Sequence, residues 1–237
     1  MISSYWAHNR DVQLHYLDSH TEHPGVPVVF VPGLRGHAEN FRPMVAALAP
    51  RRALALSLRG RGQSYAPDAG YSFTHLVSDV ATVITQARLT RCCLVGHSVG
   101  VTYAIGCALE YPDQVAGLVL AGYPAVYPVM SADWALHVLS EYPGEMRAKA
   151  LLGIQQESEA VDLWPRLGEL RCPLLVLRGG KESSRLDAES AQKYQIYAPA
   201  AEVQVFEDAG HRLWVPDFDR FIGAVRAFAE KLDAAQG

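Results

Sequence analysis

The chain alternates short apolar runs with longer stretches whose apolar residues recur at helical spacing. Six of the runs are too short for helices and predict buried strands: residues 28–31, 52–58, 92–95, 115–121, 174–177 and 202–206. The amphipathic and Ala-rich stretches predict helices at residues 41–49, 72–88, 99–110, 187–197 and 217–232. Two further strands joined by a turn are predicted at residues 3–8 and 12–17.

Strands that alternate with helices indicate an α/β fold. We expect a mostly parallel, twisted sheet of about eight strands with helices on both faces. The length of 237 residues fits one domain that spans residues 1–237.

The alternation breaks at residues 122–170, which are rich in aromatic residues and proline. Residues 132–140 and 145–153 in this segment have helical patterns. We therefore expect a small helical cap, inserted between two strands of the sheet and lying over it.

Ser98 lies in the sequence Gly96-His97-Ser98-Val99-Gly100, between a predicted strand and a predicted helix. The G-x-S-x-G pattern in that context is the nucleophile elbow. The sharp turn forces its central residue into strained backbone geometry, and small neighbours relieve the crowding. Ser98 is therefore the candidate nucleophile.

A serine nucleophile needs a base, and that base needs an orienting group. His211 follows the last predicted strand and is the candidate base, because ligands bind at the carboxyl ends of strands in open α/β sheets. Glu182 follows the preceding strand and is the preferred acid. Asp187 is its rival, although it also fits as the N-cap of the next helix.

Acyl transfer also needs donors for the developing oxyanion. The backbone N–H of Val99, at the start of the helix, is one candidate. The N–H of Leu34, in the Gly-containing loop after residues 28–31, is the other.

Charge, hydropathy and cysteine usage limit the partners and the location that we expect for this protein. A formal net charge of -4 gives no basic surplus, so we expect neither nucleic acid nor an anionic membrane as a partner. No apolar stretch approaches the roughly 20 residues of a membrane span, and the first residues do not resemble a signal peptide. The four cysteines match neither a disulfide framework nor a zinc site. We expect a cytoplasmic protein with a small-molecule substrate, no metal and no cofactor.

These motifs together resemble the α/β-hydrolase family over nearly the whole chain. Gly96–Gly100 is similar to the family's elbow, Ala209–His211 to its histidine loop, and Leu56–Ser64 to its Asp-x-Arg-Gly-x-Gly-x-Ser segment. The resemblance implies Ser98 as nucleophile, His211 as general base and then acid, and Leu34 with Val99 as oxyanion donors.

The sequence departs from the family pattern at three places. Pro32 replaces the usual histidine before the oxyanion loop glycine, Ser57 replaces the aspartate of the Arg-Gly segment, and Glu182 replaces the usual aspartate. An alternative family position for the acid, after residues 115–121, holds Gly122 and Tyr123. The third member of the triad is therefore the triad position at which this sequence departs from the family pattern.

The resemblance implies a serine hydrolase that cleaves a small carboxylic ester or lactone through an acyl-enzyme. Hydrolysis of C–C bonds, aminopeptidase activity and perhydrolysis use the same machinery and stay open. A non-catalytic ligand-binding protein with this fold is the alternative from another class.

Candidate substrate-binding residues lie after the predicted oxyanion donor and in the predicted cap. They are Arg35, Tyr123, Tyr127, Trp134 and His137. Arg35 is also consistent with a solvated loop residue, as is Arg59, and the aromatic residues with the core of the cap. An apolar cap over the elbow implies a partly apolar pocket.

Overall fold

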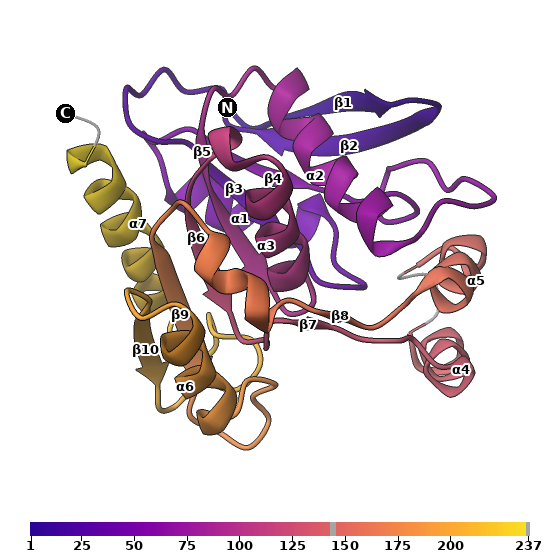
Figure 1. The fold of residues 1–237 in the computed structure, drawn as a ribbon. Coiled ribbons are helices and arrows are strands. Elements are labelled where there is room, and N and C mark those ends of the chain that lie inside the picture. The colour runs from indigo at the N-terminus through magenta and orange to yellow at the C-terminus, as the bar shows by residue number, and fades with distance from the viewer. Residues whose placement is uncertain (143–145, 236–237) are drawn as a thin grey trace.

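The computed structural model describes residues 1–142 and 146–235, and within them it contains one eight-stranded sheet (Figure 1). Its strand order is β1-β2-β4-β3-β5-β6-β9-β10. The strands are β1 (Ser3–Asn9), β2 (Val12–Asp18), β3 (Val28–Val31), β4 (Ala53–Leu56), β5 (Cys92–His97), β6 (Val115–Ala121), β9 (Leu174–Gly179) and β10 (Glu202–Phe206). Strands β1 and β2 pair antiparallel, as do β2 and β4, and the remaining pairs are parallel. The predicted fold class is confirmed.

The faces of the sheet are covered by α1 (Arg42–Ala47), α2 (Phe73–Gln86), α3 (Gly100–Glu110), α6 (Ala188–Tyr197) and α7 (Phe218–Ala234). Successive residues of β5 point to opposite faces. Cys92 and Leu94 join one core cluster with α2 and α3, whereas Cys93 and Val95 join another with α1 and α7. The continuous apolar runs therefore arise from strands buried on both sides.

Most predicted boundaries agree with the structure to within a few residues. The stretch predicted as one helix at 41–49 is a 3-10 turn, η1 (Ala38–Phe41), followed by α1. Another 3-10 turn, η2 (Pro112–Gln114), precedes β6. Asp187 caps α6 by accepting a hydrogen bond from the Ser190 N–H (2.7 Å).

Residues 122–170 leave the sheet after β6 and return to it before β9. Two short strands, β7 (Val126–Tyr127) and β8 (Val161–Asp162), pair antiparallel and lead out to α4 (Ala132–Glu141) and α5 (Ala148–Glu157) (Figure 1). A 3-10 helix, η3 (Trp164–Glu169), leads back. The start predicted for the second helix, residue 145, lies outside the described residues. We call residues 122–170 the insertion.

The insertion contacts the rest of the chain through α5. Ala150 lies against Gly60, and Gly153 lies against the Tyr71 ring. Glu157 accepts hydrogen bonds from the N–H groups of Gly70 (2.8 Å) and Tyr71 (2.7 Å). Small residues on α5 therefore allow it to pack closely on the loop after β4. Within the described residues, no helix has the length and apolar character needed to cross a membrane.

Candidate active site

Ser98 lies at the sharp turn between β5 and α3. Its φ of 56° is in the left-handed region, which costs a non-glycine residue on the order of 1–3 kcal/mol. The turn is held by a hydrogen bond from the Ser98 N–H to the Ala121 carbonyl (3.0 Å). Gly33 approaches so closely that a Cβ on it would lie 2.8 Å from the Ser98 Cβ. The β3 loop can therefore reach the serine only with glycine at this position.

His211 lies on the loop after β10, and its Nε2 is 3.0 Å from the Ser98 Oγ. The His97 Nε2 lies 3.0 Å from the His211 carbonyl oxygen, and the two imidazole rings have centroids 4.9 Å apart. The residue before the serine therefore holds the histidine loop in place, in a structural role. For Nε2 to accept the serine proton, the other ring nitrogen, Nδ1, must carry its own proton.

Burial lowers the pKa of His211 to about 3, and the nearby His97 and Arg185 also lower it, while the Gly122 backbone acts in the opposite direction. Burial likewise lowers the pKa of His97 to about 4. Both rings are therefore neutral at pH 7, and a neutral His211 is the form that can accept a proton.

No side chain orients His211 among the described residues, and the only group whose hydrogen bond raises its pKa is the Gly122 backbone. Its Nδ1 is buried and has no hydrogen-bond partner among the described residues. The loop after β9 does run beside the histidine loop, because the Lys181 N–H donates to the Ala209 carbonyl (3.0 Å). The side chain that lies against Gly210, however, is that of Ser183.

Neither candidate acid is brought to His211. The Glu182 side chain is exposed and makes no described hydrogen bond to the ring. Asp187 is occupied as the N-cap of α6. The position at the end of β6 is filled by Gly122, and a Cβ there would lie 3.7 Å from the His211 Nδ1.

The two predicted oxyanion donors flank the serine. Val99 is the N-cap residue of α3, and Leu34 follows Gly33. Within the described residues, neither N–H donates to a backbone carbonyl, so both are available to a developing oxyanion. The Leu34 carbonyl accepts a hydrogen bond from the Arg61 Nε (3.1 Å), which anchors this loop.

The predicted substrate-binding residues fall into two groups. Tyr127 belongs to the core cluster that also contains Val99, and half-buried Tyr123 and Trp134 pack against that cluster. Arg35 and His137 are in the second group, and both contact the ring of Tyr142. The Arg35 guanidinium lies 3.6 Å from the centroid of that ring, and the exposed His137 meets it edge-on at 5.8 Å.

Two polar residues in this region were not predicted. Arg61 and Tyr103 are fully buried. Among the described residues, the Nη2 of Arg61 has no hydrogen-bond partner, and the Tyr103 hydroxyl has none besides the Tyr127 hydroxyl. Tyr103 could have been found from its spacing, since it lies one helical turn after Val99. Arg61 gave no such signal, because an arginine in a glycine-rich loop usually faces solvent.

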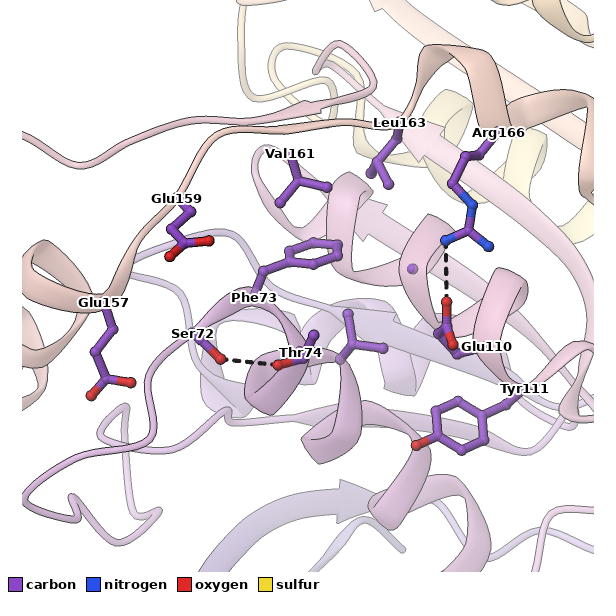
Figure 2. A pocket seen from close by; sticks show the side chains of 12 residues that line it. Ser72, Phe73, Thr74, Glu110, Tyr111, Glu157, Glu159, Val161, Leu163 and Arg166 are labelled. Atoms are coloured by element: carbon purple, nitrogen blue, oxygen red, sulfur yellow. Dashed lines mark hydrogen bonds and ion pairs between the residues drawn. The ribbon is translucent and has the colours of Figure 1, made fainter.

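A cavity of about 610 Å³ lies away from the serine, between α2, α3 and β8 (Figure 2). Phe73, Val161 and Leu163 line its middle, and the Glu110–Arg166 ion pair (3.1 Å) lies at one end. The Phe73 ring also packs on Tyr127, with centroids 5.1 Å apart. Phe73 therefore contributes both to this cavity and to the cluster that contains Tyr127.

No group of three or more His, Cys, Asp or Glu side chains that could hold a metal ion occurs in residues 1–142 and 146–235. The chemistry that the site itself offers is that of a serine hydroxyl beside a neutral imidazole.

Comparisons with known proteins identify the family of this chain. The model described as "Alpha/beta hydrolase family" matches residues 28–224. The chain therefore belongs to the α/β-hydrolase family. It is 30% identical over 206 residues to "Putative carbamate hydrolase RutD" of Variovorax paradoxus, covering 69% of this chain and 76% of that protein.

Two solved structures illustrate the shared fold. The esterase RhEst1 from Rhodococcus sp. ECU1013 has a TM-score of 0.83 and 23% identity, covering 97% of this chain and 99% of its own. The enol-lactonase from Burkholderia xenovorans LB400 also has a TM-score of 0.83, with 19% identity, covering 94% of this chain and 99% of its own. At these identities the likeness shows the fold alone.

Proposed function

We propose that this protein is a serine hydrolase that cleaves a small carboxylic ester or lactone. The observation that carries the proposal is the 3.0 Å contact between the His211 Nε2 and the Oγ of Ser98, which has the positive φ of a nucleophile elbow.

In the proposed reaction, the Ser98 Oγ attacks the carbonyl carbon while its proton passes to the His211 Nε2. The N–H groups of Leu34 and Val99 donate to the oxyanion of the tetrahedral intermediate. His211 then gives the proton to the leaving oxygen, and an acyl-enzyme remains. Water deprotonated by His211 hydrolyses the acyl-enzyme and regenerates Ser98.

The insertion is the proposed cap over this site. Tyr127 from the insertion shares a core cluster with Val99, and Trp134 packs against that cluster, which supports a partly apolar pocket. We also propose a cytoplasmic location, supported by the free thiols of Cys92, Cys93, Cys107 and Cys172. Ester and lactone substrates are favoured by the names of the structural neighbours, an esterase and an enol-lactonase.

One observation favours a second candidate, a non-catalytic ligand-binding protein. The Nδ1 of His211 has no carboxylate partner among the described residues, and loss of that partner in a triad typically costs about 10⁴ in kcat.

Labelling with a fluorophosphonate, followed by intact-mass measurement, separates the two candidates. We expect the wild type to gain one adduct and Ser98→Ala to gain none. Folded wild-type protein that stays unlabelled would contradict the hydrolase proposal. A panel of p-nitrophenyl esters of graded acyl length, together with lactones, then identifies the substrate class.

A further inference from the structure

Arg61 is a fully buried cation without a carboxylate partner among the described residues. Its Nε donates to the Leu34 carbonyl (3.1 Å) and its Nη1 to the Arg59 carbonyl (2.8 Å), but Nη2 has no partner. Arg59 shows the usual arrangement two residues earlier, where Asp79 neutralises it through two guanidinium nitrogens (2.8 and 2.6 Å). A guanidinium stays charged in a protein, so burying it without an anion is unfavourable.

Two tyrosine hydroxyls that feel the Arg61 charge have no hydrogen-bond partner besides each other in the described part of the chain. Tyr103 and Tyr127 are fully buried, and their ring centroids are 5.8 Å apart. Burial raises the pKa of both hydroxyls, and the Arg61 charge acts in the opposite direction on each. Both phenols therefore stay protonated at pH 7 and can donate hydrogen bonds.

The cluster of Arg61, Tyr103 and Tyr127 adjoins the predicted oxyanion donors. Arg61 is bonded to the carbonyl of Leu34, the residue whose N–H is one donor. Tyr103 is four residues after Val99, the other donor, and so lies on the same face of α3 one turn away. The insertion reaches the cluster too, since Tyr127 is in β7 and Met146 forms a backbone bridge with Arg61.

We propose that Arg61, Tyr103 and Tyr127 form a subsite that binds a carboxylate of the substrate. A carboxylate supplies the missing negative charge, and its two oxygens can accept from Nη2 and from both hydroxyls. The subsite proposal rests on the proposed hydrolase function. It specifies the substrate class as an ester or lactone that carries a second, free carboxylate, such as a half-ester of a dicarboxylic acid.

Isothermal titration calorimetry with Ser98→Ala at pH 7 tests the subsite without requiring turnover. The probes are glutarate, the product of a half-ester of that class, and its neutral diamide, glutaramide. We expect glutarate to bind at least tenfold more tightly than glutaramide. Equal affinities, or no binding of glutarate, would overturn the subsite.

Tyrosine variants in the same background locate the binding. Tyr103→Phe and Tyr127→Phe each remove one hydroxyl that has no described partner besides the other hydroxyl, and we expect each to weaken glutarate binding at least threefold. Tyr194→Phe is the matched control, because it removes a buried hydroxyl that donates to the Tyr123 carbonyl (2.9 Å), outside the cluster. If neither Tyr103→Phe nor Tyr127→Phe changed the affinity for glutarate, the anion would bind elsewhere and the proposal would fail.

Protection of Ser98 against the fluorophosphonate separates this proposal from the proposed function. We expect glutarate to slow labelling of the wild type, with each variant compared with its own unprotected rate. If the fluorophosphonate labels Ser98 but glutarate neither binds nor protects, the subsite proposal is overturned and the hydrolase proposal is not affected. If glutarate binds in a way that the tyrosine variants weaken, but the fluorophosphonate does not label the folded wild type, the subsite proposal is supported and the hydrolase proposal is overturned.

Discussion

Gly122 faces the unpaired nitrogen of the candidate base, since a Cβ on Gly122 would lie 3.7 Å from the His211 Nδ1. This glycine directly follows β6, which ends at Ala121, and has a φ of 71°. The carboxyl end of β6 is therefore the place from which a side chain could orient His211, and in this chain that place holds a glycine.

Gly122→Asp is expected to supply the missing carboxylate. Aspartate tolerates a positive φ better than most residues, and the substituted Cβ would meet only ordinary contacts. A carboxylate beside Nδ1 favours the imidazolium that forms during proton transfer. We expect kcat for a p-nitrophenyl ester at pH 8 to rise at least tenfold.

Gly122→Asn is the control for that variant, because it has nearly the same shape without the charge. We expect it to leave kcat within about threefold of the wild type. Identical gains for the two variants would show that backbone geometry, and not a carboxylate, limits His211.

The pH dependence of the wild type should be unusual for a serine hydrolase. An unperturbed histidine has a pKa of about 6.5, and burial lowers that of His211 to about 3. His211 then stays neutral, and able to act as a base, as the pH falls from 8 to 5. We expect kcat/KM to stay nearly constant over that range, whereas Gly122→Asp should show an acid limb at higher pH.

The stability of the folded protein sets the lowest pH at which kcat/KM can be measured. Below pH 6.5 the unfolded chain protonates His97 and His211, but the folded chain does not until the pH approaches their lowered pKa values. The unfolded state thus binds more protons, so stability falls as the pH decreases from 6.5 towards 4. Circular dichroism at each pH identifies the range in which the enzyme is folded. A wild-type acid limb near pH 6.5 in folded protein would contradict the neutral, unpaired His211.

The sequence was sufficient to predict the elements that depend on local pattern. Apolar runs buried on both faces marked the parallel strands, and Asp187 was recognised as a possible helix cap. Those features are determined by side-chain periodicity and by short-range hydrogen bonds, which a single sequence displays.

Features that depend on long-range contacts were not predictable in this way. Arg59 was interpreted as a solvated loop residue, but it is buried and paired with Asp79. No signal in the sequence pointed to Arg61, which is buried with its Nη2 unpartnered among the described residues. Glu182 followed the expected strand, yet the loop turns Ser183 towards the histidine loop. Side-chain direction in a loop is decided by packing partners that are distant in the sequence.

Glu182→Gln tests the acid assignment directly. Because the Glu182 side chain is exposed and the His211 Nδ1 has no described partner, we expect ester turnover to fall less than threefold. A loss of more than tenfold would restore Glu182 as the acid of the triad. Asp187→Asn keeps a capping side chain and serves as the matched variant, also with a small expected effect.

The cost of keeping unpartnered groups inside the protein can be measured without any ligand. A buried hydroxyl with a hydrogen-bond partner contributes about 1 kcal/mol to stability, whereas removing one that has no partner is close to neutral or stabilising. We therefore expect Tyr194→Phe, which loses its bond to the Tyr123 carbonyl, to lower the free energy of unfolding by about 1 kcal/mol. Tyr103→Phe and Tyr127→Phe, whose hydroxyls have no partner besides each other among the described residues, should be less destabilised than Tyr194→Phe.

Urea unfolding at pH 7, with all four proteins measured side by side, checks this contrast. If Tyr103→Phe or Tyr127→Phe were as destabilising as Tyr194→Phe, its hydroxyl would have to be satisfied in the free protein, for instance by buried water. Stabilisation by either variant, together with weaker glutarate binding, would indicate that these hydroxyls are kept for a ligand at the expense of stability.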